Sequence, residues 1–533
     1  MRTVPDAASL PEDINALKQL LLEQYARVAA QEEQLHTALE QLLERDVLIE
    51  KLRIELLRLK RMRFGRSSEQ LDAKIAQLEL TLEELEASKT QIAHAATASV
   101  AEEQTERVKP VRKALPPQLP REDVVHAPAC SCEACGGQLE RLGEDVSEVL
   151  EYVPSHFKVI RHVRPKFACA QCRSITQCPA PQRPIARGLA GPGLLAHVLV
   201  SKYCDHLPLY RQSEIYARSG VELERSTLAD WVGQCSALLT PLSNALNRYV
   251  LAGSKLHADD TPVPVLQPGR GTTKHGRLWT YVRDDRTSAS TDPPAVWFAY
   301  SPDRKGIHPR THLKDFNGVL QADGYAGFDR LFNEADAQHA IKEAACWAHA
   351  RRKFYDIHQA TQSPLALEAL NRIGELYAIE DQIRGQSPDM RQQARMLRAT
   401  PKIAALHAWM IQTKANLSKK SDLAGAIHYA LSRWRALTRY CEDGRIEIDN
   451  NAAERSLRPI ALGRKNYLFA GSDAGGERAA IIYSLLGTAK LNGIDPEGYL
   501  RYVLDRIAEH PINRVDELLP WNLAAQITPE QQS

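Results

Sequence analysis

Long apolar segments are missing from this sequence. The longest such run, GLLAHVLV from Gly193, is far shorter than the roughly 20 residues that a membrane-spanning helix needs. The N-terminal stretch MRTVPDAASLPEDINAL also lacks the apolar core of a secretory signal. We therefore expect a soluble protein with no membrane partner.

An excess of charge of either sign is missing too. The formal net charge is +2 over 533 residues, so any DNA-binding surface must come from local clusters rather than from overall composition. A chain of this length exceeds the roughly 250–300 residues at which a single hydrophobic core stops growing. The sequence thus predicts several domains.

Cysteine is scarce and partly grouped in pairs. The ten cysteines include two C-x-x-C pairs, in CSCEACGG and CAQC, and four isolated residues, Cys204, Cys235, Cys346 and Cys441. This pattern fits metal binding in a reducing compartment, the cytoplasm, better than a disulfide framework.

The paired cysteines predict a structural zinc site within residues 124–180. Two C-x-x-C pairs can close a tetrahedral site, and the expected Zn²⁺ ligands are Cys132, Cys135, Cys169 and Cys172. The gap between the pairs is longer than in the shortest zinc ribbons. One ligand could therefore be replaced by another residue of the same segment, namely Cys130, Cys178, His126 or His162.

Residues 1–85 carry a sustained heptad pattern. Its aliphatic positions are Leu21, Val28, Leu35, Leu42, Ile49 and Leu56. Neither Gly nor Pro interrupts the repeat, so it predicts a leucine-zipper coiled coil that makes the chain a homo-oligomer. An amphipathic helix packed on its own domain is the alternative. The basic segment LLRLKRMRFGRSSEQL at its end offers three candidate DNA contacts, Arg61, Arg63 and Arg66.

Two further segments precede the region of strands. Residues 86–123, which are rich in Ala, Thr, Glu, Lys and Pro, predict a linker. Residues 181–250 are helical, and LYRQSEIYARSGVELERSTLADWVGQC predicts two helices about a turn at Gly220, with Ser226 as N-cap of the second. A DNA-binding helix-turn-helix has this shape, but so does a plain helical hairpin.

From residue 251 the pattern changes to strands. They are KLHADDTPVPVL, RLWTYVRDD, AVWFAYSPDR and GVLQADGY, and EAACWAHARRKF has the pattern of a short strand entering a helix. The fold class expected is multidomain α/β, with a central sheet from residues 251–360. Residues 361–440 form a helical insertion, residues 441–490 resume a compact segment, and residues 491–533 form C-terminal helices.

Two aspartates occupy unusual places in these strands. Asp259 lies inside the first strand, and Asp323 ends the fourth, just before Gly324. Asp is disfavoured in strands, and ligands gather at the carboxyl ends of parallel strands. Each could be a turn former or a satisfied polar group. With a glutamate on a helix they could instead hold two Mg²⁺ ions roughly 3.5–4 Å apart for phosphodiester chemistry.

Glu454, in EIDNNAAERSLRP, is the candidate for that third carboxylate. A capping box with Asn451 is the alternative, because the two are three residues apart. If Glu454 only caps, Glu447 or Asp449 becomes the next acid to test. Pro459 is expected to kink or end the helix. Its early turns also carry two candidate phosphate contacts, Arg455 and Arg458.

The order of these motifs resembles one known family. Nearly the whole chain is similar to the large DDE transposases of the insertion sequence 66 group. The resemblance rests on the zipper with MRFGRSSEQL, the cysteine segment, ADDTPVPVL, LQADGYAGFD, CWAHARRKFYD and IDNNAAERSLRPIALGRKNYLFAGSDAGGERAAIIYSLLGTAKLNGIDP. It implies an RNase H-like catalytic core with a helical insertion and a magnesium-binding triad of Asp259, Asp323 and Glu454. Asp260 departs from the family, which more often has Glu there, so the two adjacent aspartates are hard to tell apart.

The resemblance also implies an activity and partners. Metal-dependent hydrolysis would free a 3′-OH at each element end, and that hydroxyl would then attack target DNA, with no side-chain nucleophile. The implied partners are DNA, as terminal inverted repeats and target, and small accessory proteins of the same element. Three residues of CWAHARRKF, His349, Arg351 and Arg352, are either phosphate contacts or plain surface charges. Two other classes remain open: an inactive DNA-binding regulator, and a nuclease of the same fold that cleaves without joining.

Overall fold

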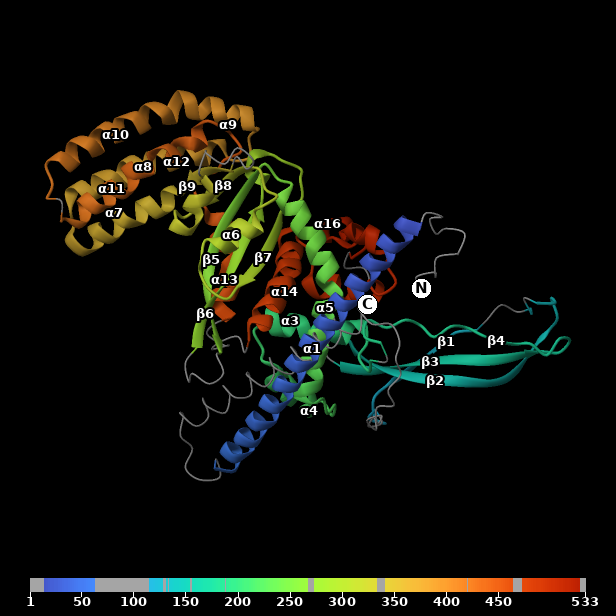
Figure 1. Ribbon diagram of the computed structural model, residues 1–533. Coiled ribbons are helices and arrows are strands. Elements are labelled where there is room, and N and C mark those ends of the chain that lie inside the picture. The colour runs from blue at the N-terminus through green and yellow to red at the C-terminus, as the bar shows by residue number, and fades with distance from the viewer. Residues whose placement is uncertain are drawn as a thin grey trace.

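A five-stranded mixed sheet forms the centre of the computed structural model (Figure 1). Its strands are β5 (Lys255–Leu266), β6 (Thr273–Arg283), β7 (Ala295–Ser301), β8 (Gly318–Ala322) and β9 (Ile341–Ala345). The order across the sheet is β7-β6-β5-β8-β9; the first three form an antiparallel meander, whereas β5, β8 and β9 run parallel. The strands expected from the sequence are confirmed.

The structure describes most of the chain. The described residues are 14–62, 115–127, 131–132, 134–153, 156–186, 188–266, 273–332, 341–418, 420–463 and 472–527. None of the helices within these ranges is long and apolar enough to cross a membrane.

The central strand β5 has two different environments along its length. Its pairing with β8 covers only Lys255–His257, whereas its pairing with β6 continues to Leu266. Pro262 and Pro264 lie in the second part, where a missing N–H costs no bond to β8. The strands β5 and β8 therefore stop pairing just before Asp259, at their carboxyl ends.

Helices from distant parts of the chain enclose the sheet. They are α3 (Pro192–Tyr203), α4 (Leu209–Arg218), α5 (Arg225–Leu251), α6 (Ile307–His312), α13 (Asn451–Gly463), α14 (Asp473–Leu491), α15 (Pro496–Arg506) and α16 (Pro520–Leu523). Trp279 and Tyr281 of β6 belong to the large core formed with α3, α5, α14 and α15. On the other face, Leu457 and Ile460 of α13 pack against β5, β6 and β7.

The expected helical hairpin is present, with one difference. Gly220 turns the chain in a left-handed conformation, with φ at 78°. The second helix, α5, begins at Arg225 with Glu224 as N-cap, so the prediction of Ser226 as N-cap is wrong. Because α5 is 27 residues long and buries apolar residues along its whole length, the structure favours the plain hairpin over a helix-turn-helix.

A separate helical block follows β9 and stands beyond that edge of the sheet (Figure 1). It consists of α7 (Trp347–Thr361), α8 (Pro364–Ile383), α9 (Pro388–Ala394), a π-helical turn (Arg395–Ala399), α10 (Thr400–Ala415), α11 (Asp422–Ser432) and α12 (Trp434–Thr438). The block has its own core, which continues into β9 through Ala344 and Ala345. Short 3₁₀ turns complete the chain at Arg286–Ser288, Ala326–Phe332, Arg439–Cys441 and Ile512–Leu518.

A long hairpin extends from the opposite side of the molecule (Figure 1). Its strands are β1 (Arg121–Val125), β2 (Leu139–Val153), β3 (His156–Cys169) and β4 (Ile175–Gln177). The turn end of the hairpin packs on the helices through Leu150, Phe157 and Val159. The cysteine pairs lie at the other end, where β2 begins and β3 finishes. β1 begins at Arg121, inside the segment expected to be a linker.

The N-terminal heptad segment forms one long helix, α1 (Ile14–Met62). Its two halves differ. Ile49 and Leu56 are buried. The pKa of Arg45 is lowered, first by burial and then by the nearby positive charge of Arg478 on α14. Leu21, by contrast, is exposed. The second half of the repeat therefore packs on its own chain, as the alternative interpretation held.

Candidate active site

Asp259 and Asp323 both lie at the carboxyl ends of the paired segments of two neighbouring parallel strands, β5 and β8. The last aligned pair is His257 of β5 and Gln321 of β8, and Asp259 and Asp323 each follow two residues later. Asp323 follows β8 directly, and Gly324 then turns the chain with φ at 80°. An Asp323 carboxylate oxygen accepts a hydrogen bond from the Tyr325 N–H at 3.0 Å.

Helix α13 is tied to the strand that carries Asp259. The side-chain amide of Asn450 donates to the Ala258 carbonyl at 2.8 Å, and its oxygen lies 3.1 Å from His257 Nδ1. Both side chains are buried. These bonds fix the start of α13 beside Asp259, although Asn450 and His257 are far apart in the sequence.

A second contact sets which face of the sheet α13 covers. Thr280 of β6 lies directly opposite Asp259 in the β5–β6 pairing. Its hydroxyl is 2.8 Å from the hydroxyl of Ser456, two residues after Glu454 on α13. Helix α13 therefore covers the face of the sheet that carries Asp259, and the side chain of Glu454 on this helix is 42% exposed.

Asp259 experiences the negative charge of the other two carboxylates. The pKa of Asp259 is raised to about 7, first by burial and then by the negative charges of Asp323, Asp260 and Glu454. Within the described ranges, two sets of possible metal ligands have all their ligand atoms within 4.8 Å of one another: the four cysteines, and Cys346 with His349 and Glu454. The oxygens of Asp259, Asp323 and Glu454 do not form such a set. Crowded acids of this kind lower their mutual repulsion by binding a divalent cation.

The adjacent aspartate, Asp260, has a different environment. Alternation along β5 points its side chain to the opposite face from Asp259. There it is 1% exposed and forms ion pairs with Arg304 at 2.7 Å and Arg277 at 3.0 Å. Its charge is already compensated by protein groups, so the structure separates the two aspartates that the sequence could not.

The capping-box interpretation of Glu454 is wrong. Among the described residues, the Glu454 side chain makes no hydrogen bond to a main-chain N–H at the start of α13, and its Oε1 lies 3.8 Å from His349 Nδ1. Asp449 caps instead, because its carboxylate accepts the Asn451 N–H at 3.1 Å. Pro459 does not end the helix, which continues to Gly463.

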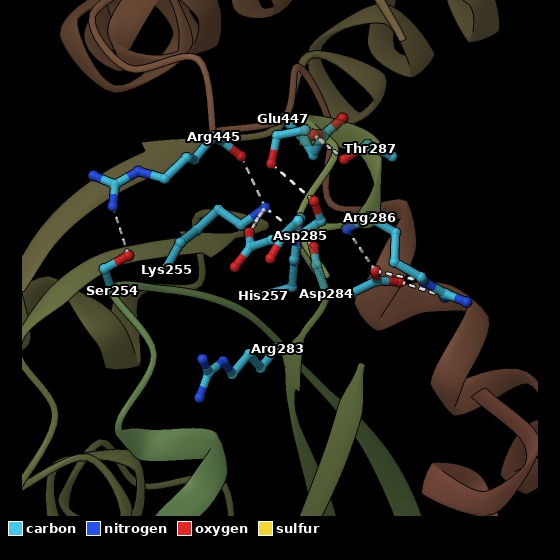
Figure 2. Close-up of polar contacts among 12 residues, drawn as sticks. Ser254, Lys255, His257, Arg283, Asp284, Asp285, Arg286, Thr287, Arg445 and Glu447 are labelled. Atoms are coloured by element: carbon cyan, nitrogen blue, oxygen red, sulfur yellow. Dashed lines mark hydrogen bonds and ion pairs between the residues drawn. The ribbon is translucent and has the colours of Figure 1, made fainter. Parts of the chain in front are cut away.

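Glu447, the other alternative acid, belongs to a buried network (Figure 2). Its carboxylate accepts from Thr287 at 2.5 Å and pairs with Arg391 at 2.9 Å. Burial alone would raise the pKa of Glu447, but Lys255 and Arg391 outweigh it and lower that pKa to about 2. Glu447 therefore anchors the helical block to the sheet and is not free to bind a cation.

The same network fixes the segment that leads to α13. Lys255 is 1% exposed, and its ammonium group donates to the Arg445 carbonyl at 2.9 Å and pairs with Asp285 at 2.9 Å (Figure 2). Gln321 of β8 exchanges hydrogen bonds with the main chain of Glu447, at 2.8 and 2.9 Å. Residues 445–450 are thus held against both strands that carry the aspartates.

The candidate DNA contacts fall into two groups. Four arginines are exposed on α7 and α13, without a recorded ion pair in the described part of the chain: Arg351, Arg352, Arg455 and Arg458. Burial raises the pKa of Asp449, and the nearby positive charge of Arg455 opposes this effect without outweighing it. Of the basic segment after α1, Arg63 and Arg66 lie outside the described residues, and Arg61 is described only in its main chain.

The clustering of the four predicted cysteines is confirmed. The sulfur atoms of Cys132, Cys135, Cys169 and Cys172 all lie within 4.8 Å of one another. The Cys132–Cys172 and Cys135–Cys169 separations are 3.5 and 3.4 Å. Tetrahedral zinc with Zn–S bonds of about 2.3 Å separates its sulfur ligands by about 3.8 Å, so the cluster fits this ion.

The substitute zinc ligands are not part of this cluster. His126 Nε2 and His162 Nδ1 lie 3.1 Å from each other with their rings stacked. Cys178 is not among the clustered side chains either, and Cys130 lies outside the described residues. Two C-x-x-C turns therefore supply all four sulfur atoms.

These features define a modular α/β protein with a four-cysteine centre and an acidic edge on its central sheet. The family model described as the IS66 transposase family matches residues 187–478, more than half of the chain. Three further models match: the IS66 C-terminal element (484–521), the zinc-finger binding domain of transposase IS66 (129–173) and the "Transposase C of IS166 homeodomain" (51–124). The chain therefore belongs to the IS66 transposase family.

Curated relatives from Sinorhizobium fredii are similar over most of their length. The uncharacterized protein y4hP is 43% identical over 493 residues, which cover 89% of this chain and 88% of the relative. The uncharacterized protein y4qI is 37% identical over 528 residues, covering 97% and 98%. The similarity to these relatives extends over nearly the whole chain.

Proposed function

We propose that the protein cleaves the ends of an insertion sequence and joins the freed 3′-OH ends to target DNA. The observation that carries this proposal is that the negative charges of Asp323, at the end of β8, and of Glu454, on α13, both raise the pKa of Asp259 on β5. This shift supports the proposal, because burial and the neighbouring negative charges disfavour the ionised Asp259 carboxylate unless a cation is bound.

The proposed core is RNase H-like. A three-stranded meander followed by two parallel strands, in the order β7-β6-β5-β8-β9, is consistent with it. The helical block between β9 and α13 matches the implied insertion, since it separates the two aspartates from the glutamate along the chain.

The three carboxylates would hold two Mg²⁺ ions. Hard oxygen ligands on separate elements suit Mg²⁺, and when bound the ions would activate the attacking oxygen and stabilise the leaving oxygen of a phosphodiester. The Asn450, His257 and Thr280 contacts hold α13, which carries Glu454, against β5 and β6 beside Asp259.

The exposed arginines are proposed to bind the DNA backbone. Arg351 and Arg352 on α7, and Arg455 and Arg458 on α13, belong to the two helices whose residues His349 and Glu454 are in contact. Phosphate contacts of this kind position DNA without reading its sequence. We extend this role to Arg61, Arg63 and Arg66. We also propose that the chain self-associates through its heptad repeat and acts with small accessory proteins of the same element.

Cleavage and joining by the purified full-length protein test the function. DNA that carries the element's terminal inverted repeats should be cut and joined to a target plasmid with Mg²⁺, and remain intact with chelator. Cleaved ends without joined product would identify a nuclease. Binding without either product would identify a regulator.

The four-cysteine cluster is proposed to bind one Zn²⁺. Loss of this ion should loosen the end of the hairpin where β2 begins and β3 finishes. Cys135→Ser is expected to remove one zinc ion per chain and make residues 131–174 sensitive to protease, because metal binding supplies the folding free energy of such turns. Native mass spectrometry and limited proteolysis measure this. The matched control is Cys178→Ser, a neighbouring cysteine outside the cluster, and zinc loss there would contradict the ligand set.

A further inference from the structure

A second group of possible metal ligands lies beside the acidic edge. Cys346 Sγ, a ring nitrogen of His349 and a carboxylate oxygen of Glu454 all lie within 4.8 Å of one another. His349 Nδ1 and Glu454 Oε1 are 3.8 Å apart. Tetrahedral zinc with bonds of about 2.0–2.3 Å separates its ligand atoms by about 3.3–3.8 Å. Only a small contraction would therefore place all three around one ion.

Rigid elements hold two of these ligands. Cys346 is the N-cap residue of α7, directly after β9, and His349 follows one turn later on the same side of the helix. Cys346 is 2% exposed, and its sulfur accepts the Asn450 N–H at 3.2 Å. The Trp347 N–H donates to the Ile448 carbonyl at 3.0 Å. These bonds also join α7 to the segment that starts α13, so the spacing to Glu454 is set by the main chain.

His349 provides an independent sign that a ligand belongs here. Its Nδ1 atom is buried and has no hydrogen-bond partner among the described residues, although it points toward Glu454. Buried polar atoms without partners are uncommon and costly. A cation between the imidazole, the thiol and the carboxylate would satisfy this atom.

We propose that Cys346, His349 and Glu454 bind a thiophilic divalent cation such as Zn²⁺, at a site separate from the four-cysteine cluster. A sulfur, nitrogen and oxygen set selects Zn²⁺ over Mg²⁺, because thiolate and imidazole suit the softer ion. Three protein ligands leave a fourth position open. Burial raises the pKa of the Cys346 thiol to about 12, so the ion must displace its proton, as thiophilic ions do.

The site shares Glu454 with the proposed magnesium triad. An ion held by Cys346 and His349 would draw this carboxylate away from Asp259 and Asp323. The sharing rests on the proposed function, whereas binding of the thiophilic ion does not. A protein that binds the ion and fails to join DNA would refute only the function.

Zinc content of the full-length protein tests the site. After loading with Zn²⁺ and dialysis, the wild type is expected to hold two ions per chain and Cys346→Ser one. His349→Ala should also hold one, and because this ring is 31% exposed it is a safer substitution for folding. The control is Cys441→Ser, a buried cysteine of the helical block outside the group, which should keep two ions.

Cobalt provides a second readout at the sulfur. Co²⁺ loaded into a zinc-depleted protein with all four cluster cysteines changed to Ser should give a near-ultraviolet thiolate-to-cobalt absorption band. The band should vanish when Cys346→Ser is added to this variant. Two zinc ions retained by both Cys346→Ser and His349→Ala, or an unchanged cobalt band, would overturn the proposal.

Discussion

Glu454→Gln is expected to abolish cleavage and joining of element ends while the protein stays folded and binds DNA. The side chain is 42% exposed and its recorded ion pair, with His349 at 3.8 Å, is long. Gln keeps the size of Glu and removes the charge that Mg²⁺ requires. We expect activity to fall by at least about 10²–10³-fold, the scale seen when one preorganised electrostatic group is lost from an active site.

The same variant should have nearly unchanged stability. Exposed substitutions usually change the free energy of unfolding by no more than about 0.5 kcal/mol. Glu454 does not cap α13, so its replacement leaves the Asp449 cap in place. Denaturant unfolding, a gel-shift assay and the joining assay together separate the outcomes.

A matched control is Glu509→Gln, an exposed glutamate after α15 that should leave all three measurements unchanged. Near-normal joining by Glu454→Gln would remove it from the triad. Glu447 and Asp449 could not easily replace it, because Glu447 pairs with Arg391 and Asp449 caps the helix. The acid would then have to come from another element.

The sequence was sufficient to predict the parts of the site that follow from local pattern. The strand alternation around Asp259 and the Gly after Asp323 located both acids, and the C-x-x-C spacing located the cysteine cluster. The strands and the helical block followed from the same alternation of strands and helices, whereas the order of the strands across the sheet came only from the structure.

What could not be predicted depends on contacts between distant residues. Asn450 reaches His257 and Ala258, which are nearly 200 positions away, and no spacing rule indicates that pair. The capping-box prediction for Glu454 failed because Asp449, one residue before the buried Asn450, takes the capping role. His257 did carry one signal, a polar residue two positions before Asp259 on the same face of the strand.

The two adjacent aspartates should have opposite effects on stability in metal-free protein at pH 8. Asp259→Asn is expected to stabilise it by about 2–4 kcal/mol. The pKa of Asp259 is raised from 3.8 to about 7, mainly by burial and by Asp323. When the pKa of a carboxyl is higher in the folded than in the unfolded protein, its contribution to folding stability is fully present below the unfolded-state pKa. That contribution is lost as the pH rises through the folded-state pKa, here about 7. Above pH 7 the ionised group therefore costs stability that Asn does not.

Asp260→Asn should do the reverse and destabilise the protein by about 2–4 kcal/mol, because it leaves Arg277 and Arg304 without their shared acid. Chemical denaturation with chelator at pH 8 and pH 4 measures both variants. The gain from Asp259→Asn should shrink toward zero at pH 4, where the wild-type carboxyl is protonated in the folded state. It should also shrink when Mg²⁺ is added at pH 8, since the wild type alone gains a ligand for the cation. A destabilised Asp259→Asn protein would mean that Asp259 is held by protein partners, as Asp260 is, and is not reserved for a metal. A gain that persists at pH 4 would mean that the cost of Asp259 does not come from its ionised carboxylate.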